Sequence, residues 1–377
     1  MATANQRELL TSLLREVSRS FYLTLRVLPG AIRPQIGLAY LLARTTDTIA
    51  DTELVPVAER LAALAQLRRR IFEASAQHAE GAELGRRSGR PTGLPRSGVS
   101  AADGAGGRLD FGRFLHGTEA GATRAARAER VLLERVEEAL SLLANLEAAD
   151  RQRISAVLEI ITSGQELDLR RFEAQPLAAG TRSLTALQTE VELDDYTYCV
   201  AGCVGEFWTR MCRAHLFPAA PLDDAWLLAQ GIRFGKGLQL VNILRDLPAD
   251  LRRGRCYLPA ERLAEVGLQP VDLLEPASEP RLRPLYHGWL DTAQAHLAAG
   301  WAYTCALPRR QFRVRLACAW PVLIGVQTLG KLRAANPLEA TQRVKVNRRE
   351  VRGILLRSTL ASGSARAWRG LFPGNTG

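Results

Sequence analysis

The sequence predicts an all-α fold, and three of its features carry that prediction. Apolar residues recur at spacings of three and four along most of the chain, while sustained two-residue alternation is rare. Glycine and proline gather between the periodic segments, as at Pro29-Gly30, which is typical of helix ends. Of the 377 residues, 47% are apolar, so the chain can bury a sizeable core in one large domain or two ordinary ones.

The periodicity predicts a series of helices. In order, they span about residues 5–27, 33–52, 56–77, 125–146, 149–172, 184–215, 223–246, 282–305 and 311–334. Residues 81–121 interrupt the pattern, because they hold 11 of the 31 glycines and can bury little apolar surface. We interpret them as a flexible insertion within one helical domain of residues 1–377, rather than a boundary between two domains, because candidate site residues lie on both sides.

Basic residues exceed acidic ones, with 50 Lys and Arg against 39 Asp and Glu, which gives a net charge of +11. Such a charge admits nucleic acid, an anionic membrane face or small acidic substrates as partners. A basic C-terminal tail from about residue 343 concentrates the excess, with eight basic residues and one acid between Arg343 and Arg369. This tail is either solvated or a contact surface for phosphates or lipid.

Cysteine usage and hydropathy predict a cytoplasmic protein. The six cysteines have no paired CxxC spacing, so zinc or a redox dithiol is not indicated and a reduced compartment is expected. The N-terminal stretch carries charges throughout and has no apolar core of a secretory signal. The longest apolar stretch, Leu316 to Leu329, is shorter than the roughly 20 residues that span a bilayer. We therefore expect no transmembrane segment.

A polar stripe falls on the helix predicted at 33–52. Tyr40, Arg44, Asp47 and Asp51 recur every three or four residues, so at about 100° per residue they share one face. Carboxylates one turn apart on a core helix are costly to bury unless a cation meets them. Oxygen ligands of this kind suit Mg²⁺, which also takes waters and substrate phosphate oxygens. The alternative is a surface ion pair between Arg44 and Asp47.

A second stripe repeats this geometry with Gln239, Asn242, Asp246 and Asp250. Two acidic helix faces in one all-α chain can face each other across a cavity and hold divalent ions, which then bind a diphosphate that the acids alone would repel. Arginines that can grip phosphate through two hydrogen bonds lie alongside, namely Arg44, Arg245 and Arg255. Pro248 disfavours continued helix, so Asp246 lies on the stripe while Asp250 can lie beyond a kink.

A third stretch, YTYCVAGCVG at 196–205, has small residues where a helix prefers larger ones. Ala201, Gly202 and Gly205 form either a packing notch for a neighbouring helix or room for an apolar ligand chain. In the second interpretation, the ring of nearby Tyr196 can stabilise a developing carbocation through its face.

Together these motifs resemble those of the squalene and phytoene synthases, the head-to-head trans-isoprenyl diphosphate synthases. The resemblance covers most of the chain and rests on four stretches in family order: SRSFYLTLRVLP at 18–29, ARTTDTIAD at 43–51, YTYCVAGCVG at 196–205 and QLVNILRDLPADLRRGRCYLP at 239–259. It implies a single-domain helical bundle of the isoprenoid-synthase type around a central cavity.

The resemblance also implies roles for individual residues. Asp47, Asp51, Asp246 and Asp250 would bind diphosphate through Mg²⁺, and Tyr196 would lie beside the reacting carbons. Further substrate contacts are implied for Ser18, Arg19, Phe21, Tyr40, Arg44, Gln239, Asn242, Arg245 and Arg255. NADPH contacts are implied for Arg19, Arg44, Arg245, Lys345 and Arg348.

Two departures from the family pattern change the details. Ala50 and Ala249 stand where the eukaryotic squalene synthases have an acid before the last Asp of each motif, so metal ligation is expected to differ. The cofactor contacts at Lys345 and Arg348 rest on a segment similar to VKIRK, in which Asn347 replaces one basic residue. No GxGxxG follows a predicted strand, so NADPH would bind in the helical cavity rather than in a Rossmann module.

The implied function is that of a squalene synthase, a transferase of isoprenoid, sterol and hopanoid lipid biosynthesis. Two farnesyl diphosphates would condense head to head with Mg²⁺ to presqualene diphosphate, which NADPH reduces to squalene. The alternatives are a phytoene synthase acting on C20 substrates, or a bacterial enzyme that stops at presqualene diphosphate or hydroxysqualene.

A nucleic-acid-binding helical protein is the distant alternative. The chain has no recognisable nucleic-acid motif, and acidic stripes repel phosphate without metal, so we expect no nucleic-acid partner. The expected partners are farnesyl diphosphate and, peripherally, an anionic membrane that receives a water-insoluble product.

Overall fold

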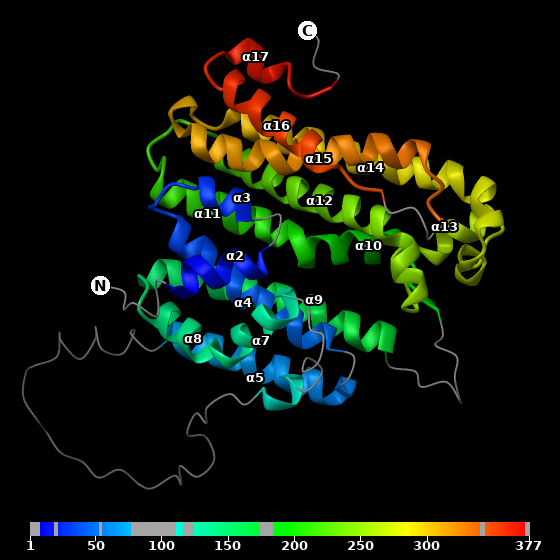
Figure 1. Cartoon of the computed structure of the whole chain (residues 1–377), viewed down its shortest axis with the longest axis horizontal. Coiled ribbons are helices and arrows are strands. Elements are labelled where there is room, and N and C mark those ends of the chain that lie inside the picture. The colour runs from blue at the N-terminus through cyan, green and yellow to red at the C-terminus, as the bar shows by residue number, and fades with distance from the viewer. Residues whose placement is uncertain are drawn as a thin grey trace, which may run out of the picture. The chain divides into compact units, whose positions relative to one another are not determined.

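Helices dominate the structure, a computed structural model that describes residues 8–18, 22–52, 55–76, 111–115, 124–173, 184–339 and 344–373 (Figure 1). The predicted all-α class is confirmed. The insertion predicted at 81–121 lies outside the described residues except for a short 3-10 turn, η3 (Gly112–Leu115), next to the buried Phe111. Within the described ranges, no helix is both long enough and apolar enough to cross a membrane.

The helices form two compact units that alternate along the sequence. The first comprises the described residues of Met1–Arg19 and Gly37–Thr162, and the second those of Ser20–Ile36 and Ser163–Gly377. The chain passes from one unit to the other inside α4 (Arg33–Asp51) and α9 (Ala148–Glu173). Each unit is therefore assembled from segments that are distant in sequence.

The first unit packs its helices around a leucine-rich core. Leu41, Leu64, Leu132 and Leu143 are fully buried, as expected for the inward stripe of amphipathic helices. The helix expected at 125–146 is divided in two, because the backbone leaves the helical region at Arg135. Besides parts of α4 and α9, the unit contains η1 (Leu9–Leu13), α2 (Leu14–Val17), α5 (Val57–Ala76), α7 (Arg124–Glu134) and α8 (Val136–Ala144).

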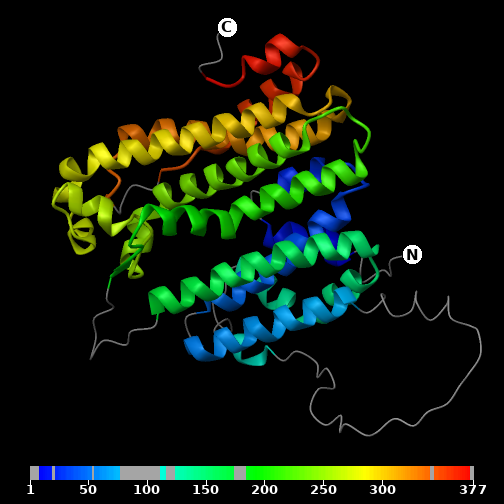
Figure 2. The same cartoon turned by 180° about the vertical axis from the view of Figure 1, so that it is seen from behind.

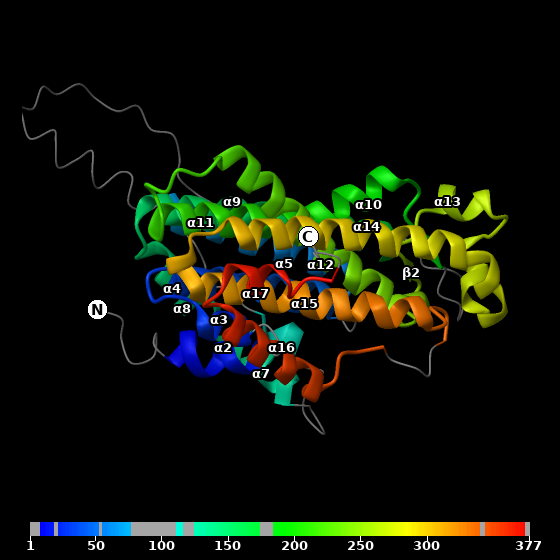
Figure 3. The ribbon, with the colours of Figure 1, turned by 90° about the horizontal axis from the view of Figure 1, so that it is seen from above.

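The second unit is organised around α12 (Asp224–Arg252). Figure 3 shows α14 (Glu279–Ala306) and α15 (Phe312–Ala334) lying side by side, and both pack on α12. Three further helical segments of this unit also pack on α12, and Figure 2 shows this green part of the chain from behind. They are α10 (Glu190–Thr197), the π-helical turn η4 (Tyr198–Gly202) and α11 (Cys203–His215). A short helix, α3 (Tyr22–Val27), packs on α15.

Several short elements of this unit escaped prediction. β1 (Thr185–Ala186) pairs in parallel with β2 (Arg255–Cys256), and the Thr185 amide donates to the Gly254 carbonyl at 3.0 Å. The others are α13 (Ala260–Glu265), η5 (Pro270–Leu274), η6 (Pro276–Ser278) and η7 (Arg309–Gln311).

The basic segment after residue 343 contains two helices within the described residues 344–373. It forms α16 (Arg348–Ala361) and α17 (Ala365–Arg369). Asn347 and Glu350 make a capping box that begins α16, and Trp368 of α17 is buried. The capping box was a readable signal in the sequence, but the high charge of the segment obscured it.

The small residues at 201–205 pack against a neighbouring helix. A Cβ added at Gly205 would overlap the carbonyl oxygen of Gly231, and one added at Gly235 would overlap the carbonyl of Ala201. The backbones of α11 with η4 and of α12 therefore touch along a glycine seam, which we define as Ala201, Gly205, Gly231 and Gly235. This corrects the interpretation in which an apolar ligand chain lies along the notch, because α12 occupies that space.

Pro248 does not end α12, which continues unbroken to Arg252. A proline leaves the carbonyl four residues earlier without its helical donor, here that of Leu244. The buried hydroxyl of Tyr286 on α14 donates to this carbonyl at 3.0 Å. Asp250 therefore stays on the same helix as Asp246, one turn further on.

Candidate active site

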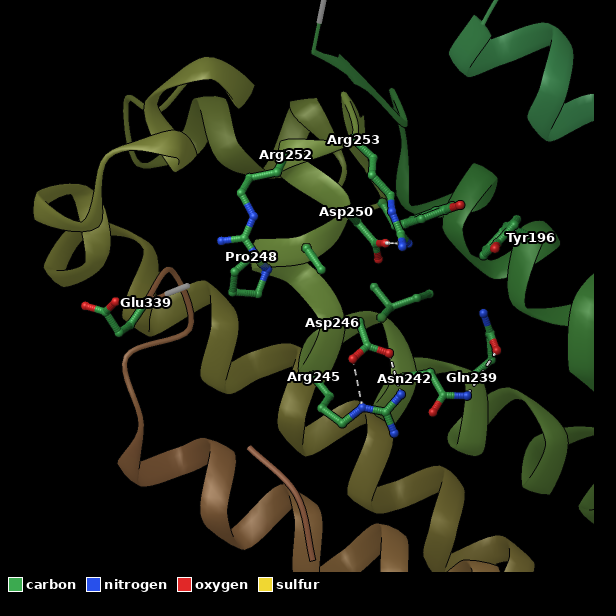
Figure 4. Close-up of a pocket in the computed structure, with 13 residues that line it drawn as sticks. Tyr196, Gln239, Asn242, Arg245, Asp246, Pro248, Asp250, Arg252, Arg253 and Glu339 are labelled. Carbon is green, nitrogen blue, oxygen red and sulfur yellow. Dashed lines mark hydrogen bonds and ion pairs between the residues drawn. The ribbon is translucent and has the colours of Figure 1, made fainter. Parts of the chain in front are cut away.

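The last turns of α12 line a cavity of about 460 Å³ in the second unit (Figure 4). Two other parts of this unit contribute tyrosines, Tyr196 on α10 and Tyr257 just after β2. Glu339, which follows α15, completes one edge. Five residues predicted from the second stripe and its surroundings line the cavity: Gln239, Asn242, Arg245, Asp246 and Asp250.

The two acids of this cavity differ in their surroundings. Arg245 binds Asp246 through two contacts, one of them from Nε to Oδ1 at 3.0 Å. The Asp250 side chain is only 18% exposed, and Arg253 lies 3.9 Å away from it. Burial, and then the charge of Asp246, raises the pKa of Asp250 to about 6, against the opposing arginines. The ionised pair therefore favours a cation.

Polar and cationic side chains surround the acids. The Asn242 amide donates to Gln239 Oε1 at 3.5 Å on the turn before Asp246. Arg252 and Arg253, beyond Asp250, line the same cavity. Because guanidinium groups bind phosphate oxygens through parallel hydrogen bonds, this end of α12 can receive an anion next to a cation held by the acids.

Tyr196 lies in an aromatic and acidic cluster. Its ring stacks on that of Tyr257 with centroids 4.6 Å apart, and the Tyr257 hydroxyl donates to Asp168 Oδ2 at 2.8 Å. Phe172 packs its edge on Tyr257. Burial, followed by the charge of Asp168, raises the pKa of Tyr196. Tyr196 is therefore a neutral phenol at physiological pH, suited to offer its ring face or a hydrogen bond.

The first stripe lies on α4 in the first unit. Arg44 binds Glu129 of α7 and lies 3.6 Å from Asp47, whose side chain is 45% exposed. Burial opposes the charge on Arg44, but the hydrogen bond and charge of Glu129, helped by Asp47, raise its pKa. The Tyr40 hydroxyl donates to the Val17 carbonyl at 3.3 Å, and Asp51 is exposed at the helix end. The four residues share one helix, as the spacing predicted.

The other predicted residues are distributed as follows. Ser18 is buried just after α2, while Arg19 and Phe21 lie outside the described residues. Arg255 lies on β2, half-buried, and does not line the cavity, although its charge lowers the pKa of Asp250. Lys345 and Arg348 are exposed at the start of α16, and within the described ranges neither side chain forms an ion pair.

Sequence reasoning missed five residues of the site: Asp168, Arg252, Arg253, Tyr257 and Glu339. Tyr257 and the two arginines belong to the motif at 239–259, so the signal was present and was not used. Asp168 and Glu339 are single acids on α9 and after α15, and no spacing links either of them to the stripes.

The residues fit a magnesium site that the substrate completes. Within the described ranges, no group of three or more His, Cys, Asp or Glu side chains gathers as a ready-made metal cage. Mg²⁺ commonly binds through one or two carboxylates and takes its remaining ligands from water and phosphate. The acids on α12, together with the raised pKa of Asp250, have this character.

Comparison with known proteins agrees with this chemistry. Residues 14–350 match the family described as "Squalene/phytoene synthase". A bifunctional lycopene cyclase/phytoene synthase of Blakeslea trispora is 28% identical over 260 residues, which cover 69% of this chain and 33% of that protein. A 15-cis-phytoene synthase of Enterobacter agglomerans is 34% identical over 143 residues, 37% of this chain and 43% of that protein. The matched part thus spans less than half the length of either relative.

Among solved structures, a complex of TcSQS with a ligand superposes with a TM-score of 0.68. The match covers 98% of this chain and 90% of that chain at 20% identity, which establishes a shared fold. The expected isoprenoid-synthase type of helical fold is therefore confirmed.

Proposed function

The chain belongs to the squalene/phytoene synthase family, whose members are head-to-head prenyltransferases of isoprenoid biosynthesis, and on this premise we propose that it condenses two identical allylic prenyl diphosphates with Mg²⁺. The observation that carries the proposal is the cavity at the end of α12. There, Asp246 and Asp250 share one helix face, with arginines on one side and the Tyr196–Tyr257 stack on the other. A diphosphate with an allylic tail requires both kinds of surroundings.

Each group of residues has a part in this proposal. Asp246 and Asp250 hold the metal, and Asp47 and Asp51 of α4 are proposed to do so for the second diphosphate. Bound Mg²⁺ supplies Lewis acidity that makes diphosphate a better leaving group. Arg245, Arg252 and Arg253 bind phosphate oxygens and screen the charge as it develops. Arg44 and Arg255 are proposed as further diphosphate contacts.

The stacked rings of Tyr196 and Tyr257 are proposed to contact the prenyl carbons of the substrate. Since Tyr196 stays a neutral phenol, its ring face can lower the energy of an allylic cation without capturing it. This favours the cation-stabilising role over that of a base. Further substrate contacts are proposed for Tyr40, Gln239, Asn242, Ser18 and Phe21.

For the product, we propose squalene, formed from two farnesyl diphosphates by way of presqualene diphosphate. This follows the motif at 18–29 and the segment at 344–348, in which Lys345 and Arg348 have side chains available for phosphate. NADPH, when bound, would supply the hydride of the second half-reaction, with Arg19, Arg44 and Arg245 as its other proposed contacts.

A second candidate product is phytoene, formed from C20 substrates. It is favoured by the names of the two relatives described above. In that case the final cation loses a proton instead of accepting hydride, so no reductant is consumed. Release of presqualene diphosphate or hydroxysqualene is the remaining outcome within the family.

One experiment separates these outcomes. Purified protein is incubated with labelled farnesyl or geranylgeranyl diphosphate and Mg²⁺, with and without NADPH, and the products are identified by mass spectrometry. Squalene that forms only with NADPH is expected. Phytoene from the C20 substrate, or hydroxysqualene regardless of NADPH, would overturn the squalene assignment. Failure to release diphosphate from either substrate would overturn the prenyltransferase itself.

A further inference from the structure

Helix α16 has one face turned into the second unit and the opposite face turned to solvent. Ile354, Ser358 and Ala361 are buried, and Trp320 of α15 donates its indole N–H to Ser358 Oγ at 3.0 Å. In Figure 1, α16 lies between α15 and α17, near the C-terminus. The inward face accounts for the attachment of α16.

The outward face carries two leucines in line with two arginines. Arg349, Arg352, Leu356 and Leu360 follow at spacings of three and four, so they form one stripe. The leucines are 62% and 73% exposed. A single exposed leucine is ordinary, but two on adjacent turns of a basic helix form a local apolar patch. We call these four residues the α16 stripe.

The charge around the α16 stripe is almost entirely positive. Arg357 borders it, Arg366 and Arg369 of α17 are exposed, and within the described ranges none of these arginines forms an ion pair. The one acid of α16, Glu350, is engaged by Lys331 at 2.8 Å and by the Asn347 amide. Among the residues that the structure describes, no acid therefore pairs with these arginines.

The exposed leucines and the arginines of the α16 stripe together distinguish among possible partners. A second copy of the chain, meeting this face by two-fold symmetry, would bring arginines against arginines. Nucleic acid would satisfy the arginines but leave the leucines without a partner. An anionic bilayer satisfies both, because leucines enter the headgroup boundary while arginines meet lipid phosphates.

We propose that the α16 stripe docks the protein on an anionic membrane surface, with Leu356 and Leu360 inserted and Arg349 and Arg352 on lipid phosphates. The inference deepens the proposed function, since a prenyl hydrocarbon product dissolves in lipid and not in water. Docking itself needs no turnover.

Vesicle flotation tests the proposal on the full chain. Wild-type protein is expected to bind vesicles of phosphatidylcholine mixed with phosphatidylglycerol and to dissociate from them at high salt. It should not bind vesicles of pure phosphatidylcholine. Leu356→Ser combined with Leu360→Ser should weaken binding at least about tenfold. Arg349→Gln combined with Arg352→Gln should weaken it by about fivefold per arginine.

A matched control comes from the same unit. Val191 on α10 is 68% exposed, but its neighbours are Glu190 and Glu192, so Val191→Ser should bind as wild type does. Circular dichroism and thermal melts establish that each variant is folded. Equal loss in the control and the leucine variant, or wild-type binding by the leucine variant, would overturn the proposal.

Two further measurements separate this proposal from its rivals and from the proposed activity. Asp246→Asn should bind vesicles normally while losing turnover, so docking can hold even if the enzyme assignment fails. Sedimentation tests for self-association of the chain, and a DNA-binding assay tests for nucleic acid as the partner. Self-association or DNA binding that depends on the α16 stripe, without vesicle binding, would refute docking on membranes.

Discussion

The two aspartates of each stripe are four residues apart, but the two pairs occupy different surroundings. On α12, Asp250 is mostly buried beside Asp246, inside a cavity, and its pKa is raised to about 6. On α4, Asp47 is well exposed, and the neighbouring arginine, Arg44, is held by Glu129. The ionised form of Asp250 is thus disfavoured by burial and would be relieved by a cation, whereas Asp47 and Asp51 of α4 are more exposed. Equal motifs in sequence need not be equal in binding energy.

The largest effect expected from this difference is on turnover. Asp246→Asn should lower kcat/KM for diphosphate release at least about 10³-fold. The substitution removes a carboxylate ligand of Mg²⁺, and the bound ion stabilises the transition state by several kcal/mol. Asp47→Asn, at the more exposed position, should lower it by about 10². Asp195→Asn, an exposed acid on α10, serves as the control. If Asp47→Asn lowers kcat/KM as much as Asp246→Asn or more, the α12 acids are not more important for turnover than the α4 acids.

The second prediction concerns pH. The ordinary pKa of Asp250, 3.8, is raised to about 6 in the folded protein, so folding favours its protonated form. The ionised carboxyl therefore reduces stability at neutral pH, and this cost fades as the pH falls towards 4. Asp250→Asn should stabilise the metal-free protein at pH 7.5 by about 1–3 kcal/mol, as measured by denaturant unfolding.

The same substitution should change metal binding. Calorimetry with Mg²⁺ and a diphosphate should give an affinity for the wild type that rises with pH through about 6 and then levels off. In Asp250→Asn this step should be lost. If the step persists, another group controls binding.

The third prediction tests what keeps Asp250 on the α12 stripe. Tyr286→Phe leaves the Leu244 carbonyl buried without its donor and should destabilise the protein by about 1–2 kcal/mol. Pro248→Ala restores a backbone N–H for that carbonyl, so Tyr286→Phe should cost much less in the Pro248→Ala background. Equal costs in the two backgrounds would mean that the hydroxyl does not substitute for the missing helical bond.

The smallest effect is expected at the ion pair of the α4 stripe. Glu129→Gln should destabilise the protein by about 1 kcal/mol, and substrate KM should change less than about threefold because Arg44 can turn to Asp47. Glu134→Gln, which breaks the more exposed Arg130–Glu134 pair, should cost under about 0.5 kcal/mol. A tenfold loss of turnover in Glu129→Gln would assign the pair a direct part in the reaction.

The sequence predicted the helices that carry the stripes, because their apolar periodicity is long and regular. It could not predict that α12 continues past Pro248, since the compensating hydroxyl comes from a helix 42 residues further on. The contact between Tyr257 and Asp168 could not be predicted for the same reason, because the two residues are 89 positions apart in the sequence.

The glycines are a different case. A small residue in a helix has the same appearance whether a ligand or a second helix fills the space, so 196–205 alone was ambiguous. The matching glycines at 231 and 235 were in the printed sequence and indicated a helix partner, once the two segments were compared.

The glycine seam also limits how this protein can change over evolution. Along it, backbone touches backbone, so there are no side chains through which the spacing of α11 and α12 can be tuned by small substitutions. Tyr196 lies on α10, which η4 follows directly, and Asp246 lies on α12. A lineage that alters the length of prenyl chain it accepts should therefore vary at positions away from the seam, leaving the spacing between the cation-facing ring and the acids unchanged.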